Sequence, residues 1–390
     1  MGEFDEPKAE CVLSVCVAPE VANLFERLHF TVHRGTVHLK LLCERTHTRR
    51  ALGNRIDNAR CATNTLRHRA SLTQHHMFTI CDSVALNAQL VDSERVTNRA
   101  HPEIITLGET MVLITPTVAE PIEKAELFRL ESGGAESNVA VHLAALGHHV
   151  AWASHLGADP FGRRIERQLR ERGVDTSLVS INADAPTGFY FKDPGLGVTY
   201  HRAGSAASAM TPELLKELPV EEAAIIHISG ITPALSTTCR DLVEAVFECA
   251  QHSGTTVSFD VNYRAGLWPI AEAAPVLLAL AQRSTIVFVG LDEAHTLWNT
   301  QSPADVRALL TEPECVVVKD ADVGATQFTR EGVVFVAAHS VAVVESVGAG
   351  DAFAAGYLSG YLTDLSAAQR LSLGHERAVL VLQSTTDLPS

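Results

Sequence analysis

From about Pro102 onward, short apolar runs alternate with amphipathic segments, and this alternation restricts the chain to few folds. The run E-I-I-T-L-G-E at 103–109 has the character of a first strand. Further strands are predicted at 149–157, 224–230, 256–260, 286–290 and 315–319, and helices at 138–147, 160–173, 242–250 and from Asp292. Strands that alternate with helices form βαβ units, whose parallel sheet is covered by helices on both faces. We therefore predict an α/β fold that binds ligands at the carboxyl ends of its strands.

One segment interrupts the alternation. Residues 187–203 read T-G-F-Y-F-K-D-P-G-L-G-V-T-Y-H-R-A, which is two β-like runs around a proline–glycine turn. This pattern predicts a hairpin. A hairpin inserted into an α/β chain can cover a site as a lid that excludes water. Because Tyr190, Tyr200 and Arg202 lie on it, we favour a lid, formed by about 121–133 and 186–203, over a surface decoration.

Charge and composition exclude several classes of protein. The 390 residues carry a net charge of -15, which argues against a nucleic-acid binder and against an electrostatic membrane partner. No apolar run approaches the ~20 residues that span a bilayer. The eight cysteines include no C-x-x-C pair, so we predict a reduced, cytoplasmic protein.

The first hundred residues differ from the rest. Residues 1–100 hold 13 basic and 11 acidic side chains, a net of +2, so the remainder carries -17. Their five cysteines and seven histidines have no compact metal-site spacing, and we find no sustained strand or helix period. We predict a poorly ordered extension, or translated upstream sequence whose natural start is Met77 or Val96, rather than a zinc or regulatory domain.

The stretch S-V-G-A-G-D-A-F-A-A-G at 346–356 places small residues directly before a predicted helix. Gly348 and Gly350 permit tight turns and bring bare N–H groups close to a ligand. The positive end of the helix dipole points at the same place, which suits an anion such as phosphate. Asp351 is then placed to accept a proton from an attacking hydroxyl. The alternative is an ordinary turn with an acidic residue that complements the dipole.

Two motifs together give this stretch a context. The sequence has G-G-A-E-S-N at 133–138 and V-G-A-G-D-A-F-A-A-G at 347–356, and it resembles the ribokinase-like (PfkB) carbohydrate kinases over about 102–390. The resemblance implies a three-layer sandwich with a mostly parallel central sheet and a small β lid. It also implies an ATP-dependent kinase, with Asp351 as general base and Gly348, Ala349 and Gly350 as anion hole. Homodimerisation through the lid is a further expectation.

Within that family the chain looks most like the 2-keto-3-deoxygluconate kinases. The matching stretches are A-P-T-G-F-Y-F-K at 185–192, Y-H-R-A-G-S-A-A-S at 200–208, H-I-S-G-I-T-P-A-L-S at 227–236 and F-D-V-N-Y-R-A-G-L-W at 259–268. By this resemblance Gly134 and Asn138 hold sugar hydroxyls. The acid end of the sugar is assigned to Tyr190, Tyr200, Arg202 and Arg264. An arginine fork suits a carboxylate, while the alternative for each arginine is a surface ion pair.

The nucleotide and metal assignments also come from the resemblance. Lys319, Gly324, Gly348, Gly350 and His375 are expected to bind ATP. Glu293 is expected near Mg²⁺, which would bridge phosphate oxygens through waters. The chain departs from the family pattern at Glu345–Ser346, Val261 and Gly290, and at His375 itself.

Three other readings stay open. One is a kinase of the same fold that acts on a neutral sugar such as fructose or ribose. Another is a non-catalytic relative that binds a sugar or nucleotide as a regulator, which the intact G-A-G-D disfavours. The third is a nucleotide-binding oxidoreductase, disfavoured because no dinucleotide fingerprint follows the first strand.

Overall fold

A computed structural model gives the fold of two units, residues 1–91 and 92–390, which are described separately. It describes residues 101–194, 197–344 and 347–384, together with the backbone of three strands in the first unit. These strands, β1 (Glu10–Cys16), β2 (Thr31–His33) and β3 (Thr36–Leu42), form an antiparallel sheet in the order β1-β3-β2. The sequence did not predict them. Most of the predicted extension and Glu345–Ser346 lie outside the described residues.

The second unit is built on one large sheet. Its strands are β4 (Ile104–Leu107), β7 (Val150–Gly157), β8 (Val179–Asn182), β11 (Ile225–Ser229), β12 (Thr256–Asp260), β13 (Ile286–Gly290), β14 (Cys315–Asp320), β15 (Gly324–Phe328) and β16 (Val333–Ala337). They are arranged in the order β16-β15-β14-β13-β12-β11-β4-β7-β8. The pairs from β14 to β8 are parallel, and β15 and β16 add an antiparallel edge. The predicted mostly parallel sheet is confirmed, but the antiparallel edge was not predicted.

Successive side chains along the strands enter two different cores. In β13, Val287 and Val289 belong to one apolar cluster, whereas Ile286 and Phe288 belong to the other. Because side chains alternate between the faces of a strand, a continuous apolar run such as I-V-F-V fills both cores. This is the pattern of a parallel sheet covered on both faces.

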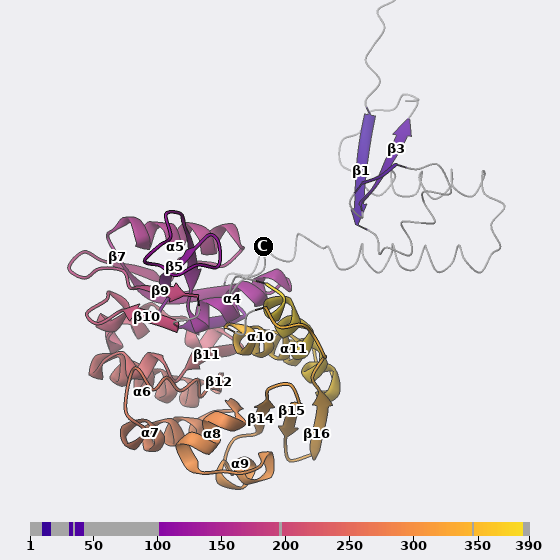
Figure 1. Cartoon of the computed structure of the whole chain (residues 1–390). Coiled ribbons are helices and arrows are strands. Elements are labelled where there is room, and N and C mark those ends of the chain that lie inside the picture. Colours follow the sequence, from indigo (N-terminus) through magenta and orange to yellow (C-terminus); the bar gives the residue numbers. More distant parts are fainter. Residues whose placement is uncertain are drawn as a thin grey trace, which may run out of the picture. The chain divides into compact units, whose positions relative to one another are not determined.

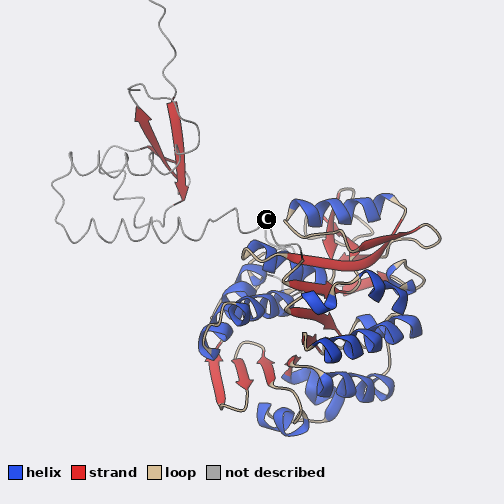
Figure 2. Ribbon diagram, turned by 180° about the vertical axis from the view of Figure 1, so that it is seen from behind, coloured by secondary structure: helices blue, strands red, loops and turns tan. Residues whose placement is uncertain are grey.

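Helices cover the two faces of the sheet, as Figures 1 and 2 show. One core contains side chains of α6 (Thr237–Ser253), α7 (Ile270–Arg283), α8 (Leu291–Trp298) and α9 (Pro303–Leu309). The other contains side chains of α4 (Ala135–Ala145), α5 (Pro160–Glu171), α10 (Ala349–Leu362) and α11 (Ala367–Leu382). Short 3-10 turns are η1 (Ala207–Ala209), η2 (Pro212–Glu217), η3 (Val220–Glu222) and η4 (Thr232–Ala234). The three layers confirm the predicted fold class.

A smaller sheet contains the predicted hairpin. Its strands are β5 (Met111–Pro116), β6 (Phe128–Gly133), β9 (Phe189–Asp193) and β10 (Gly197–His201), in the order β10-β9-β5-β6. β9 and β10 pair antiparallel, which confirms the hairpin. The lid function of 121–133 and 186–203 and the dimer through it stay predictions. Val198, Tyr200 and Leu127 of this region are exposed apolar side chains.

Two further findings concern the helices and the cysteines of the described residues. None of the helices described is both long and apolar enough to cross a membrane. Cys239, Cys249 and Cys315 are free thiols.

Candidate active site

Charged side chains gather where the central parallel strands end. Asp260 is the last residue of β12, Gly290 ends β13, and Lys319 is the penultimate residue of β14. Because parallel strands run in the same direction, their carboxyl ends meet at one edge of the sheet. The sequence positions of these residues are far apart, but the sheet places them beside one another.

The G-A-G-D turn forms the N-terminus of α10. Gly348 caps this helix with φ of 82°, a left-handed conformation that glycine adopts at little cost. Ala349, Gly350 and Asp351 make the first turn, and all three are partly accessible. The first N–H groups of a helix have no partner within it, so this turn offers donors to an anion. This backbone geometry is compatible with the predicted anion cradle, whose contact with a phosphate stays a prediction.

Asp351 and Asn138 connect the two sequence motifs. Asn138 Nδ2 in α4 donates to Asp351 Oδ2 at 2.8 Å, across 213 residues of sequence. Burial raises the pKa of Asp351 to about 7, although the Asn138 hydrogen bond acts in the opposite direction. The carboxylate of Asp260 raises this pKa further, while Arg264 and Lys319 lower it. Such a pKa suits a general base that works near neutral pH.

Lys319 lies beside the same turn. Its Nζ is 2.8 Å from Asp260 Oδ2, and it is 3.4 Å from the position that a Cβ on Gly350 would occupy. Burial alone would lower the pKa of Lys319, but Asp260 and Glu293 outweigh it and the pKa is raised. The ammonium group is therefore held charged next to the cradle, which is consistent with the predicted contact to a phosphate.

Glu293 and Arg264 complete the charged cluster. Glu293 Oε2 accepts from the Gly290 N–H at 2.8 Å and Oε1 from the Tyr263 N–H at 2.9 Å. Burial, and then the neighbouring Asp260, raise the pKa of Glu293. Arg264 is exposed, with Nη1 donating to the Tyr263 carbonyl at 3.2 Å. Its charge lowers the pKa of both Glu293 and Asp351, so it lies within electrostatic reach of the presumed base.

The lid residues form a continuous series of contacts that ends near α4. The Arg202 guanidinium lies 5.6 Å from the centroid of the Tyr200 ring, whose centroid is 5.5 Å from that of Tyr190. A Cβ at Gly133 would lie 2.1 Å from the Tyr190 hydroxyl oxygen, so only glycine fits there. Gly134, the next residue, is the N-cap of the helix that carries Asn138. The structure thus brings the predicted sugar-binding residues from the hairpin towards the predicted base.

Arg202 has a partner that the sequence analysis missed. Its Nε donates to Glu109 Oε2 at 2.7 Å, and its Nη2 also contacts that oxygen. Glu109 lies two residues after the end of β4, and a charged residue near a strand's carboxyl end was the available signal. Glu136 was also missed. It is buried in α4 and its Oε1 accepts from the Ser229 and Thr232 hydroxyls.

Gly324 and His375 lie together beside the end of β14, because Gly324 of β15 pairs with Asp320, the residue after Lys319. A Cβ on Gly324 would approach the Val336 carbonyl oxygen to 2.4 Å, and His375 Nε2 is 3.1 Å from the same oxygen. The His375 ring packs edge-on against Phe353 of α10, with centroids 5.1 Å apart. Burial lowers the pKa of His375, which favours a neutral ring. Their contact with a nucleotide stays a prediction.

Two buried acceptors in the cluster have no protein partner. Asp260 Oδ1 and Asn138 Oδ1 are both without a hydrogen bond from the described residues. Buried polar atoms are normally satisfied, so these two acceptors, one at the end of β12 and one in α4, are suited to hydroxyl groups of a ligand or to water. No group of three or more histidine, cysteine or acidic side chains within the described ranges could hold a metal by itself.

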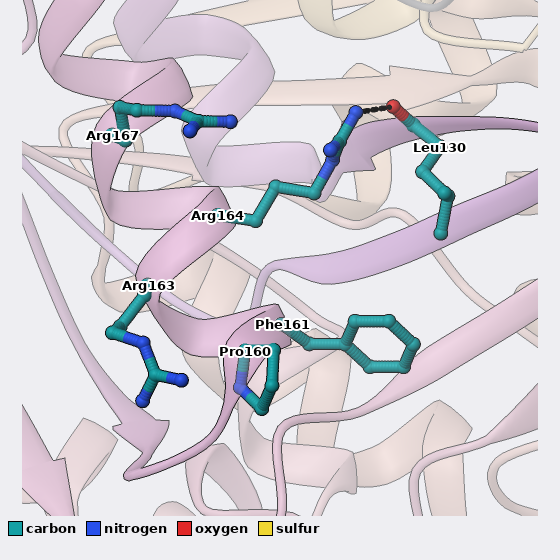
Figure 3. A pocket seen from close by; sticks show the side chains of 6 residues that line it. All are labelled: Leu130, Pro160, Phe161, Arg163, Arg164 and Arg167. Carbon is teal, nitrogen blue, oxygen red and sulfur yellow. Dashed lines mark hydrogen bonds between the residues drawn. The ribbon is translucent and has the colours of Figure 1, made fainter.

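A separate hollow lies outside this cluster. Figure 3 shows it between α5 and β6, with a volume of about 340 Å³. Arg164 crosses between these elements and donates from Nη2 to the Leu130 carbonyl at 2.8 Å. Its lining contains none of the residues that the sequence predicted for the site.

Comparison with known proteins gives the relatives of this chain. The family model described as pfkB family carbohydrate kinase matches residues 101–389. The 2-dehydro-3-deoxygalactonokinase of Haloferax volcanii is 33% identical over 289 residues, which cover 71% of this chain and 90% of that protein. The 2-dehydro-3-deoxygluconokinase of Bacillus subtilis is 32% identical over 303 residues, covering 73% and 91%. A fructokinase of Oryza sativa is 31% identical over 275 residues, covering 68% and 85%.

A solved structure extends the comparison to three dimensions. The crystal structure of a PfkB protein from a Polaromonas species is 34% identical, with a TM-score of 0.68. The match covers 73% of this chain and 97% of that one.

Proposed function

The chain belongs to the pfkB family of carbohydrate kinases, and from that premise we propose that it transfers the γ-phosphoryl group of ATP to a sugar-acid hydroxyl. The proposed acceptor is 2-keto-3-deoxygluconate and the product its 6-phosphate. The observation that carries the proposal is the position of Asp351. Its carboxyl, with a pKa of about 7, is hydrogen-bonded to Asn138 and lies in the first turn of α10.

The proposed chemistry follows from that first turn. Asp351 accepts the proton of the sugar hydroxyl as the hydroxyl oxygen attacks the γ-phosphorus. The bond from the γ-phosphorus to the β–γ bridging oxygen breaks, and ADP leaves with that oxygen. The N–H groups of Ala349 and Gly350 hold the phosphoryl oxygens, and the Lys319 ammonium adds positive charge from the other side. Asn138 orients the carboxylate of Asp351 through its Nδ2. These groups are positioned before the reaction, so little reorganisation is needed.

The preference for an acid sugar is proposed from the lid and from charge. Residues 101–390 carry a strongly negative net charge, so an anionic sugar needs local cations. Arg202 and Arg264 supply them, and Tyr190 and Tyr200 line the same region. The similarity to kinases of 2-dehydro-3-deoxy sugar acids supports this choice.

The residues present fit ATP with Mg²⁺. Magnesium prefers oxygen ligands and keeps several waters, and the free Oδ1 of Asp260 and the carboxylate of Glu293 provide oxygens near the cradle. Mg²⁺ bound with ATP would neutralise phosphate charge there. Lys319, Gly324, Gly348, Gly350 and His375 remain the proposed nucleotide contacts.

The test of the proposed function is ADP release with a panel of acceptors. We expect 2-keto-3-deoxygluconate to give a higher kcat/KM than fructose, ribose or gluconate. A clear preference for fructose or ribose would be compatible with a kinase of this family but would contradict a sugar acid as the acceptor. The similarity to fructokinases favours that alternative. No ADP release with any acceptor would instead favour a non-catalytic protein that binds a sugar or nucleotide as a regulator.

The pKa of Asp351 predicts how the reaction depends on pH. The base must be ionised, and with a pKa of about 7 the ionised fraction falls as the pH is lowered through neutrality. We expect kcat/KM, which reports the free enzyme, to rise about tenfold between pH 6 and pH 8 and then to level off. Rates of ADP release in buffers of constant ionic strength measure this. A profile that is flat over the same range would contradict the assignment.

The division into two units predicts that the first is dispensable. The first strand of the large sheet, β4, begins at Ile104, and residues 92–390 form a unit with its own cores. A chain that begins at Val96 should therefore be soluble, unfold cooperatively and match the full chain in kcat/KM. Circular dichroism melting and ADP release compare the two. Aggregation or loss of activity in the shorter chain would show that the kinase unit needs the preceding residues.

A further inference from the structure

Glu109 is a buried carboxylate at the junction of the two sheets. It lies between β4 of the large sheet and β5 of the small sheet, and its side chain is 0% exposed. A charge that is buried in this way is costly unless it is paired and hydrogen-bonded. The hydrogen-bond partners of Glu109 therefore indicate its role.

Both oxygens of Glu109 are committed to the segment that follows the hairpin. Oε2 accepts from Arg202 Nε at 2.7 Å and contacts Arg202 Nη2, and Oε1 accepts from the Ser205 hydroxyl at 2.7 Å. A Cβ on Gly188 would lie 3.0 Å from Oε1, so the bare glycine keeps the start of β9 close to the carboxylate. Glu109 thus holds this segment at two of its residues, Arg202 and Ser205.

The pairing with Glu109 fixes one edge of the Arg202 guanidinium and leaves the other edge available to a ligand. The contacts to Glu109 use Nε and Nη2, whereas Nη1 has no hydrogen bond within the part of the chain that the structure describes. The side chain is only 11% exposed, and the Tyr200 ring lies 5.6 Å from its central carbon. A guanidinium fork is planar, so holding one edge also sets the direction of the free edge.

We propose that Glu109 is a positioning residue that fixes Arg202 for the carboxylate of the sugar acid, and so sets the preference for acid over neutral sugars. The inference rests on the proposed function. Glu109 does not touch the substrate. It acts by holding Nε and Nη2, so that Nη1 meets the substrate carboxylate without first losing conformational freedom.

The test is Glu109→Gln, which keeps the size of the side chain and removes its charge. Arg202 then loses its ionic partner and its fixed direction. We expect KM for 2-keto-3-deoxygluconate to rise roughly tenfold, the effect of losing one charge-assisted contact. The kcat for the acid sugar and the KM for fructose should change less than twofold. A purely structural role would instead change both sugars alike.

Three further variants make the result specific. Glu109→Asp keeps the charge and should restore part of the acid preference. Ser205→Ala keeps the Glu109–Arg202 pair, removes the hydroxyl on Oε1, and should produce a smaller loss in the same direction. The control is Glu244→Gln, because Glu244 also pairs with an arginine that packs on an aromatic ring, Arg283 over Phe247. It lies on the outer helices and should change neither sugar.

The outcomes separate this inference from the function on which it rests. If wild type prefers a neutral sugar, the sugar-acid function and the inference both fail. If wild type prefers the acid sugar and Glu109→Gln keeps or increases that preference, only the inference fails. Should Glu109→Gln melt before the assay temperature, Ser205→Ala decides, and an unchanged ratio of acid to neutral kcat/KM in that variant overturns the proposal.

Discussion

Replacement of Asp351 by asparagine is expected to lower kcat by roughly 10²–10⁴, the usual range for the loss of a general base. In the wild-type protein Asn138 Nδ2 lies 2.8 Å from Asp351 Oδ2. The introduced amide is nearly the same size as the carboxylate, and its oxygen can still accept this hydrogen bond. It cannot take a proton from the sugar hydroxyl. KM for both substrates should therefore change little while kcat falls, and ADP release under saturating substrates measures this.

Stability provides a second readout for the same variant. The pKa of Asp351 is raised in the folded protein to about 7 from an ordinary value of 3.8. The folded state thus binds a proton more tightly than the unfolded state, and stability falls as the pH rises through this interval. The asparagine of Asp351→Asn does not titrate, so the variant does not lose stability in this way as the pH rises. The melting temperature of the variant at pH 8 should therefore equal or exceed that of wild type.

The control and the contradicting result are equally direct. Asp241→Asn makes the same chemical change on an exposed position of α6 and should leave kcat unchanged. If Asp351→Asn kept more than half of the wild-type kcat, Asp351 would not be the base.

Replacement of Arg264 by alanine is expected to raise KM for 2-keto-3-deoxygluconate roughly 10- to 100-fold, since a charge-assisted contact contributes on the order of 1.5–3 kcal/mol. Arg264 is exposed at the carboxyl end of the sheet, and among the described residues the Tyr263 carbonyl is its one hydrogen-bond acceptor. It is therefore free to pair with a carboxylate that enters the site. A neutral sugar has no charge that loses a partner, so its KM should change much less.

The assay must separate binding from the state of the base. Arg264 lowers the pKa of Asp351, so its removal raises that pKa and reduces the ionised base near neutral pH. Measurement at about pH 8.5 keeps Asp351 ionised in both proteins and isolates the effect on KM. Arg283→Ala, on the outer helix α7, is the matched control. An equal effect of Arg264→Ala on fructose and on the acid sugar would reject the carboxylate contact.

Local patterns in the sequence were sufficient for most of the architecture. The alternating apolar and amphipathic segments predicted the parallel strands β4, β7, β11, β12, β13 and β14, because burial on both faces requires continuous apolar runs. They did not predict the parallel edge strand β8. The proline–glycine turn predicted the hairpin of β9 and β10. The G-A-G-D stretch predicted a helix that opens at Asp351, and α10 begins two residues earlier, at Ala349, directly after the left-handed Gly348.

The edge strands and the first unit were not predicted. β15 and β16 continue the large sheet antiparallel. In β16 exposed and half-buried side chains alternate, and β15 contains the polar Thr326 and Gln327, so both make a weaker apolar signal than a buried parallel strand does. The strands β1 to β3 lie in a region without a sustained period. Pattern-based prediction is strong only where burial imposes a regular pattern.

What the sequence alone determined was the chemical content of the proposed site: a candidate base, a glycine turn, two tyrosines and an arginine in a hairpin, and a second arginine after β12. Only the tertiary structure decided which of these groups meet. The Asn138–Asp351 hydrogen bond, the Lys319–Asp260 pair and the Glu109–Arg202 pair join residues 213, 59 and 93 positions apart. No local periodicity predicts contacts between residues that lie so far apart in the sequence. They follow from the order of the strands in the sheets, which brings the ends of separate strands and the start of α10 to one edge and determines which charges neutralise each other there.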